Sequence, residues 1–132
     1  MKMKKTVLSI LLCISLVACY YDKADVINPN AAYVGCDTTS VNYNSVVAPI
    51  LSNNGCLSCH SGSASSGGKI PLDTYTSAKS SAVKGELLPS VRQDATCAAC
   101  GSNYAPMPAG GSKISDCNIN KIAAWINQGC KN

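Results

Sequence analysis

Apolar residues recur at helical spacing in three stretches of the sequence. In the first, from 45 to 51, they share one face, and Asn53-Asn54-Gly55 then supplies a break. The residues from 61 to 68 are mostly Ser and Gly without apolar periodicity, which predicts a loop. A second, modest helix is predicted from Thr74 to Lys84.

The clearest helix is predicted near the end of the sequence. Ile119, Ile122 and Ile126 share one face, Ser115 suits the N-cap position, and Gly129 suits the position just after the last turn. No run of residues has the period of a β-strand, so none competes with these helices. The sequence therefore predicts a mainly α fold.

The N-terminal segment has the pattern of a processing signal. Lys2, Lys4 and Lys5 precede an apolar run from 7 to 17, which is too short to span a bilayer. The run closes with Leu16-Val17-Ala18-Cys19, a close match to a bacterial lipobox. We therefore expect residues 1–18 to be a lipoprotein signal peptide and Cys19 to become the acylated first residue, anchored to the membrane without spanning it.

The stretch that follows has no helical period and contains Asn28-Pro29-Asn30. It predicts a lipidated tether over residues 19–35, although Tyr20 and Tyr21 could instead pack on the domain or lie at the lipid headgroups. From Cys36 onward the sequence has no internal repeat. We expect one domain over residues 36–132.

Composition directs attention to cysteine chemistry. The chain of 132 residues has nine Cys, one His, no Phe and only 14% charged residues. The formal net charge is +4, but without the three N-terminal lysines eight basic residues face seven acidic ones. Such a balance gives no reason to expect nucleic-acid binding.

The motif that carries the chemistry is Cys56-Leu57-Ser58-Cys59-His60. Two thiols at this spacing can add to the two vinyl groups of a haem, and the histidine that follows can bind the iron as an axial ligand. His60 is also the only histidine in the chain. The pattern predicts one covalently attached haem c on Cys56 and Cys59, with a structural histidine or a surface dithiol as the alternative.

A second axial ligand is predicted at Met107, the only methionine after the signal peptide. It stands between Pro106 and Pro108 and before Gly110-Gly111, so the backbone is restricted and can turn tightly. Such a loop suits the presentation of one thioether to iron, whereas a methionine that only fills the core would be expected on a periodic apolar face.

These residues resemble the small monohaem cytochrome c domains of class I type, in particular the exported lipoproteins of Bacteroidetes-like bacteria. The resemblance covers roughly residues 36–130 and implies a helical fold wrapped around one haem, His60 and Met107 as axial ligands of the iron, electron transfer, and a disulfide between Cys36 and Cys117. The matching segments, besides CxxCH, are Val46-Val47-Ala48-Pro49-Ile50-Leu51, Ser61-Gly62, Leu72-Asp73-Thr74-Tyr75, Met107-Pro108-Ala109-Gly110-Gly111, Ile114-Ser115-Asp116-Cys117 and Trp125-Ile126.

Three further cysteines, Cys97, Cys100 and Cys130, leave their pairing open. Gly101, not His, follows Cys100, so a second haem is not expected there. A zinc site built from both CxxC pairs is the rival interpretation, although the pairs lie far apart in the sequence and thiols of exported proteins tend to oxidise.

The sequence thus favours an electron carrier, not an enzyme, on a lipid anchor in the bacterial cell envelope, with redox proteins as unnamed partners. One alternative is a haem-free, disulfide-stapled interaction lipoprotein. Another is a haem sensor or peroxidase with an open iron site, but with His60 used as a ligand no acid/base pair is visible for peroxidase chemistry.

Overall fold

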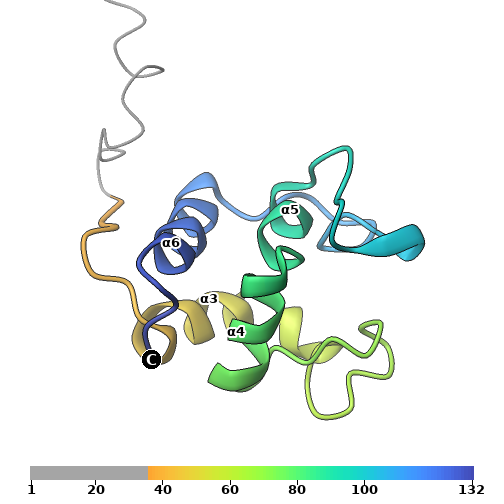
Figure 1. Ribbon diagram of the computed structural model, residues 1–132, viewed down its shortest axis with the longest axis horizontal. Helices are drawn as coiled ribbons and strands as arrows, with labels where there is room; N and C mark the ends of the chain where they lie inside the picture. Colours follow the sequence, from red (N-terminus) through yellow and green to blue (C-terminus); the bar gives the residue numbers. More distant parts are fainter. Residues whose placement is uncertain (1–35) are drawn as a thin grey trace, which may run out of the picture. The chain divides into compact units, whose positions relative to one another are not determined.

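A computed structural model describes residues 36–132 of the chain, and Figure 1 shows that these residues form a mainly helical domain. No strand occurs within this part of the chain. The predicted signal peptide, Cys19 and the predicted tether up to residue 35 lie outside the described residues. The elements, in chain order, are the π-helical turn η1 (Tyr43–Val47), α3 (Ala48–Asn53), the 3₁₀ turn η2 (Cys56–Ser58), α4 (Tyr75–Lys84), α5 (Leu87–Arg92), the 3₁₀ turn η3 (Gly101–Asn103) and α6 (Asp116–Asn127).

The first predicted helix is confirmed, and it begins earlier than the apolar pattern indicates. Asn42 caps η1, because its side-chain oxygen accepts a hydrogen bond of 2.9 Å from the Ser45 N–H. The helix continues through α3 and buries Val47, Ile50 and Leu51. It ends directly before the CxxCH motif.

The second predicted helix is also confirmed, as α4, and a short helix that the sequence analysis did not predict follows it. Thr74 caps α4 and forms a capping box with Ser77, and Gly85 ends it in the left-handed conformation at φ 81°. The unpredicted helix is α5, which buries Leu87 and Val91. It is only six residues long and contains a proline, so no periodic pattern marks it.

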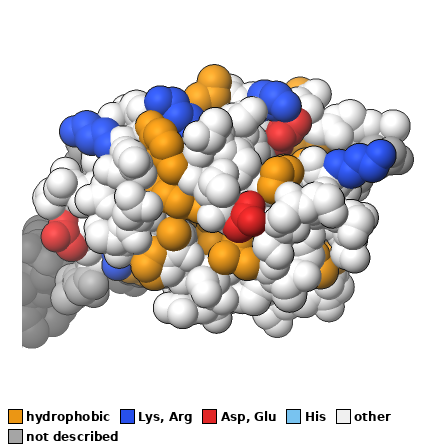
Figure 2. All heavy atoms as spheres, turned by 90° about the horizontal axis from the view of Figure 1, so that it is seen from below, with side chains coloured by type: hydrophobic (Ala, Val, Ile, Leu, Met, Phe, Trp, Pro, Cys, Tyr) orange, Lys and Arg blue, Asp and Glu red, His pale blue; other side chains and the backbone are white. Residues whose placement is uncertain are grey.

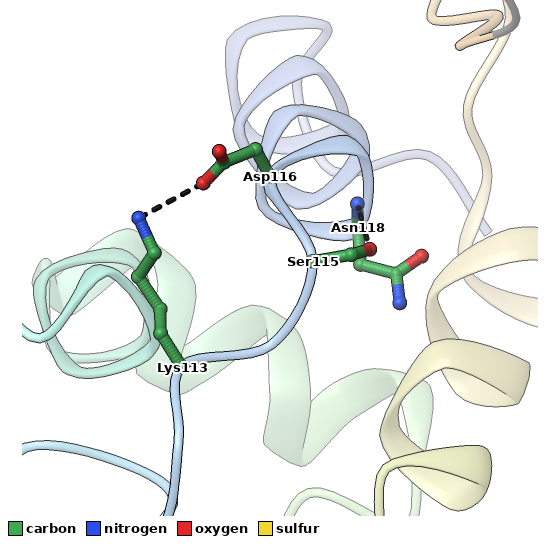
Figure 3. Close-up of polar contacts among 4 residues, drawn as sticks. All are labelled: Lys113, Ser115, Asp116 and Asn118. Carbon is green, nitrogen blue, oxygen red and sulfur yellow. Dashed lines mark hydrogen bonds and ion pairs between the residues drawn. The ribbon is translucent and has the colours of Figure 1, made fainter.

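The last helix has the two ends that the sequence predicts. The Ser115 side chain accepts a hydrogen bond of 3.3 Å from the Asn118 N–H, and Lys113 pairs with Asp116 at 2.9 Å in the first turn (Figure 3). At the other end Gly129 has a φ of 87°, a conformation in which glycine carries no steric cost.

The core lies where α6 packs against η1 and α5. Its largest fully buried side chain is Trp125, whose ring centroid is 6.0 Å from that of Tyr43. The indole N–H of Trp125 donates a hydrogen bond of 2.7 Å to the Lys131 carbonyl, so this buried donor is satisfied. The other fully buried side chains are those of Leu51, Ile122, Val41 and Val47.

Two cysteine pairs lie at disulfide distance. Cys36 and Cys117, with Cα atoms 5.6 Å apart, join the start of the domain to α6, which is the pair that the resemblance implies. Cys97 pairs with Cys100, with Cα atoms 5.3 Å apart, and buried Cys130 stays a free thiol. Within residues 36–132 the structure brings no three His, Cys, Asp or Glu side chains together at a metal-binding distance, so it does not join the two CxxC pairs as the rival zinc interpretation requires.

Candidate haem-binding site

The CxxCH motif forms one tight turn directly after α3. Gly55 precedes it with a φ of 72°, which reverses the chain at the helix end. The Cys56 carbonyl then accepts hydrogen bonds from the N–H groups of Cys59, at 3.3 Å, and His60, at 3.0 Å. The two thiols and the imidazole are therefore held within a single helical turn.

The two thiols of the motif differ in their surroundings. Cys59 is exposed, whereas Cys56 is half-buried, and neither forms a disulfide. Burial raises the pKa of the Cys56 thiol. Cys56 therefore carries its proton at neutral pH, as an S–H group that can add across a vinyl double bond.

The His60 imidazole is oriented by a backbone carbonyl. Its Nδ1 atom lies 2.7 Å from the carbonyl oxygen of Ile70. Because a carbonyl oxygen can only accept, Nδ1 carries a proton, and in the neutral imidazole Nε2 then has the free lone pair. This is the tautomer that a metal ligand needs, with its second nitrogen engaged by an acceptor.

Backbone contacts hold the Ile70 carbonyl in place beside the histidine. The Leu72 N–H donates a hydrogen bond of 2.7 Å back to the His60 carbonyl, so the two segments lie side by side. Pro71 disfavours a helical conformation at Ile70 and keeps that residue extended. No side-chain pattern in the sequence points to Ile70, and the one available signal is Pro71, eleven residues after His60.

Gly67 also lies directly against the imidazole. The glycine is buried, and a Cβ added to it would lie 2.6 Å from His60 Nδ1 and 2.5 Å from the Cys59 carbonyl oxygen. Only glycine permits such an approach. The predicted loop from 61 to 68 is confirmed, and it is a series of turns that includes hydrogen bonds from the Gly67 and Lys69 N–H groups to the Ala64 carbonyl, at 3.0 and 2.9 Å.

The segment that contains Met107 is fastened to α5. The Met107 N–H donates a hydrogen bond of 2.9 Å to the Ser90 carbonyl, and the Gln93 side-chain amide donates to the carbonyls of Met107, at 3.4 Å, and Gly111, at 3.1 Å. The Tyr104 hydroxyl shares its proton between the Pro89 carbonyl in the middle of α5, at 3.1 Å, and the Asp94 carbonyl just beyond the helix, at 2.8 Å. Met107 itself is half-buried. The helix that the sequence analysis missed is therefore the support of the predicted distal ligand.

Figure 1 shows how the two halves of the candidate site are arranged. The CxxCH turn and the loop after it lie below the end of α5 in this view, and the 95–112 segment lies above them, both at the same end of the domain. These residues fit a covalently attached haem by their chemistry: two free thiols in one turn, an imidazole with Nε2 available, and a thioether on an anchored segment.

Comparisons with known protein families, characterised proteins and solved structures found no match to this chain. In the part of the chain that the structure describes, no helix is both long and apolar enough to cross a membrane.

Proposed function

We propose that the domain is a monohaem c-type cytochrome that passes single electrons between redox proteins at a membrane of the bacterial cell envelope. The observation that carries the proposal is the hydrogen bond of 2.7 Å between His60 Nδ1 and the Ile70 carbonyl. A histidine in CxxCH that only filled space would not need one fixed tautomer, whereas an axial ligand does.

Each residue of the candidate site then has one role. Cys56 and Cys59 would hold the haem by thioether bonds, formed as each S–H group adds across a vinyl double bond, and His60 would bind the iron through Nε2. Met107 is the proposed second ligand, and its soft thioether favours ferrous iron. The bound haem supplies an iron that gains and loses one electron. With His60 and Met107 both holding the iron, no position would be left for a substrate, and the protein would act as a carrier and not as an enzyme.

Covalent haem is the first property to test. We expect the full chain, produced together with a cytochrome c assembly system, to keep haem after denaturing electrophoresis and to gain the mass of one haem. Replacing both Cys56 and Cys59 by Ser should abolish this attachment. The matched control, Cys97→Ser with Cys100→Ser, removes the other CxxC pair and should keep the haem. A wild-type chain without covalent haem would refute the proposal and favour the haem-free interaction lipoprotein.

Membrane anchoring is tested separately. The proposed lipid is on Cys19, which precedes the described domain, so Cys19→Ser should release the protein from the membrane fraction or stall its processing without changing the haem spectrum. If the variant is processed as before and stays with the membranes, the lipid anchor is wrong, and the electron-transfer proposal is unaffected.

A further inference from the structure

The two segments that form the candidate haem site are free of charged side chains. No Asp, Glu, Lys or Arg occurs from 38 to 68 or from 95 to 112, although 14% of the whole chain is charged. We use the name exchange surface for residues 53–68 and 95–112. It contains CxxCH, the loop that backs His60, and the Met107 segment.

Much of the exchange surface is open to solvent. The Cys59 side chain is exposed, and so are Ser61, Ser63, Pro106 and Ala109. A haem attached at Cys59 would be bonded to an exposed sulfur, and a redox partner would have to approach near that bond because electron transfer slows steeply with distance. The partner therefore meets side chains that are small and uncharged.

The charges that flank the exchange surface come in opposite signs. Lys69 and Asp73 follow the loop from 61 to 68 that backs His60. The Asp73 carboxylate accepts a hydrogen bond of 2.8 Å from the Gly62 N–H in that loop. Beside the Met107 segment one surface hollow is lined by two cations and two anions, which are Arg92, Lys113, Asp94 and Asp116. Lys113 and Asp116 already pair with each other at 2.9 Å. Neither flank supplies a net field toward the site.

Figure 2 shows one face of the molecule, on which side chains of both charges are interspersed among uncharged polar ones and a broken band of hydrophobic ones. Such a distribution does not steer a charged partner to one point by long-range attraction. A partner that docked with a charged face would also desolvate its charges against an uncharged surface without gaining ion pairs.

We propose that the exchange surface docks a redox protein whose own contact surface is uncharged, by short-range packing and hydrogen bonds instead of charge pairing. This inference rests on the proposed electron-transfer function. Association would then proceed at the unsteered rate of about 10⁵–10⁶ M⁻¹ s⁻¹ and vary little with salt. The proposed lipid tether suits this mode, because confinement at a membrane raises the effective concentration of the partner.

The test compares charged variants of the exchange surface with a charged variant elsewhere. Ser63→Lys and Ala109→Lys each add one cation at an exposed position of the surface, and Asn127→Lys adds one at the exposed last residue of α6, outside the exchange surface. Electron exchange is measured with ferricyanide and with the tris(phenanthroline)cobalt(III) cation at ionic strengths of about 10 and 100 mM, where the screening length is about 30 and 10 Å.

For the wild type we expect both probes to change their rate less than about threefold between these salt concentrations. The two surface variants should react with ferricyanide about tenfold faster at low salt and lose this gain at high salt, whereas Asn127→Lys should behave as the wild type. Wild-type rates that move strongly and in opposite directions for the two probes would overturn the proposal, as would an equal gain in Asn127→Lys.

A second measurement follows the chain itself and does not depend on electron exchange. Hexacyanochromate(III) broadens the amide NMR signals of residues near which it binds. We expect no preferred broadening of residues 53–68 and 95–112 in the wild type, and local broadening in the two surface variants only. Preferred broadening of the wild-type exchange surface would show a built-in charge preference and contradict the proposal, as would a dimer in solution that the surface variants dissociate.

The two proposals fail in different ways. A chain without covalent haem refutes the proposed function, and the docking proposal falls with it. A chain that carries haem but shows strong salt dependence at the exchange surface refutes the docking proposal alone.

Discussion

The proximal and distal halves of the candidate site are held by different kinds of contact. On the proximal side, His60 is fixed inside one short stretch of chain, by the Ile70 carbonyl at 2.7 Å and by close contact with Gly67. On the distal side, Met107 depends on a separate helix, through Ser90 and the amide of Gln93. Histidine orientation is therefore a local property of the chain, whereas the position of the methionine depends on tertiary structure.

The largest expected effect separates the two axial ligands. His60→Ala should prevent formation of a stable low-spin haem protein, because the variant loses the ligand that the attachment turn presents to the iron. Met107→Ala should keep the covalent haem, lower the reduction potential and open the iron to carbon monoxide. Haem staining and carbon monoxide difference spectra measure both. If the wild type binds carbon monoxide as readily as Met107→Ala, the site is open and a sensor or peroxidase replaces the electron carrier.

A steric change at Gly67 tests the proximal half. Gly67→Ala places a methyl group 2.5 Å from the Cys59 carbonyl oxygen and 2.6 Å from His60 Nδ1. We expect a loss of about 3 kcal/mol in the free energy of unfolding, because backbone and ring must both shift. The neighbouring Gly68 has no atom within 4 Å of an added Cβ but a φ of 63°. Gly68→Ala should therefore cost only about 1 kcal/mol and serves as the control. Equal losses in the two variants, measured by chemical denaturation, would contradict the close approach.

Removal of the Cys97–Cys100 disulfide tests whether the distal half needs its cross-link. The bond joins cysteines only three positions apart, so the chain-entropy model assigns it about 2 kcal/mol, against about 4.5 kcal/mol for Cys36–Cys117 with a separation of 81. We expect Cys97→Ser with Cys100→Ser to lower stability by no more than this amount. Met107 ligation should persist, because Ser90, Gln93 and Tyr104 hold the segment independently. Loss of the thioether-to-iron absorption band in this double variant would show that the disulfide positions the ligand.

The smallest expected effect concerns the Gln93 side chain. Gln93→Ala removes its two hydrogen bonds to the carbonyls of Met107 and Gly111 and should weaken the methionine position by about 1 kcal/mol. Affinity for carbon monoxide should then rise about fivefold. Gln128→Ala is the matched control, because Gln128 also makes two hydrogen bonds to the backbone, with Val41 and Thr38, but in another part of the domain. It should lower stability without changing carbon monoxide binding, and an equal change in both variants would rule out a specific role for Gln93.

The helices that carry clear end signals were predictable from the sequence. Ser115, Thr74 and the glycines that follow both helices mark the ends of α6 and α4 because capping depends on residue type. The helix α5 has no such signal: Glu86 precedes it without a side-chain cap, and Pro89 lies within it. Its existence depends on the burial of Leu87 and Val91 against the rest of the domain.

The side chains of the candidate site could be predicted from the sequence, but the backbone groups and cysteine pairing that hold them in place could not. CxxCH and Met107, the one methionine after the predicted signal peptide, identify the candidate ligands because haem attachment and iron ligation require particular side chains. The Ile70 carbonyl could not be identified in this way, since every residue has a carbonyl and only the fold brings this one to His60. The same limit applies to the pairing of Cys97 with Cys100, which left Cys130 as the odd thiol.

Hydrogen bonds to residues 130 and 131 have a consequence for the order in which the domain can fold during synthesis. The Tyr43 N–H and the Trp125 indole N–H both donate to the Lys131 carbonyl, at 2.9 and 2.7 Å, and the Tyr75 hydroxyl donates to the Cys130 carbonyl at 2.8 Å. Until residue 131 has left the ribosome, the Trp125 indole N–H and the Tyr43 N–H lack the Lys131 carbonyl as their acceptor. An unpaired donor costs about 1–3 kcal/mol when it is buried. The nascent chain thus stays short of its final packing until nearly the whole described domain has been made. For a chain that we propose to be exported, this late completion favours threading through a translocation channel before the domain folds.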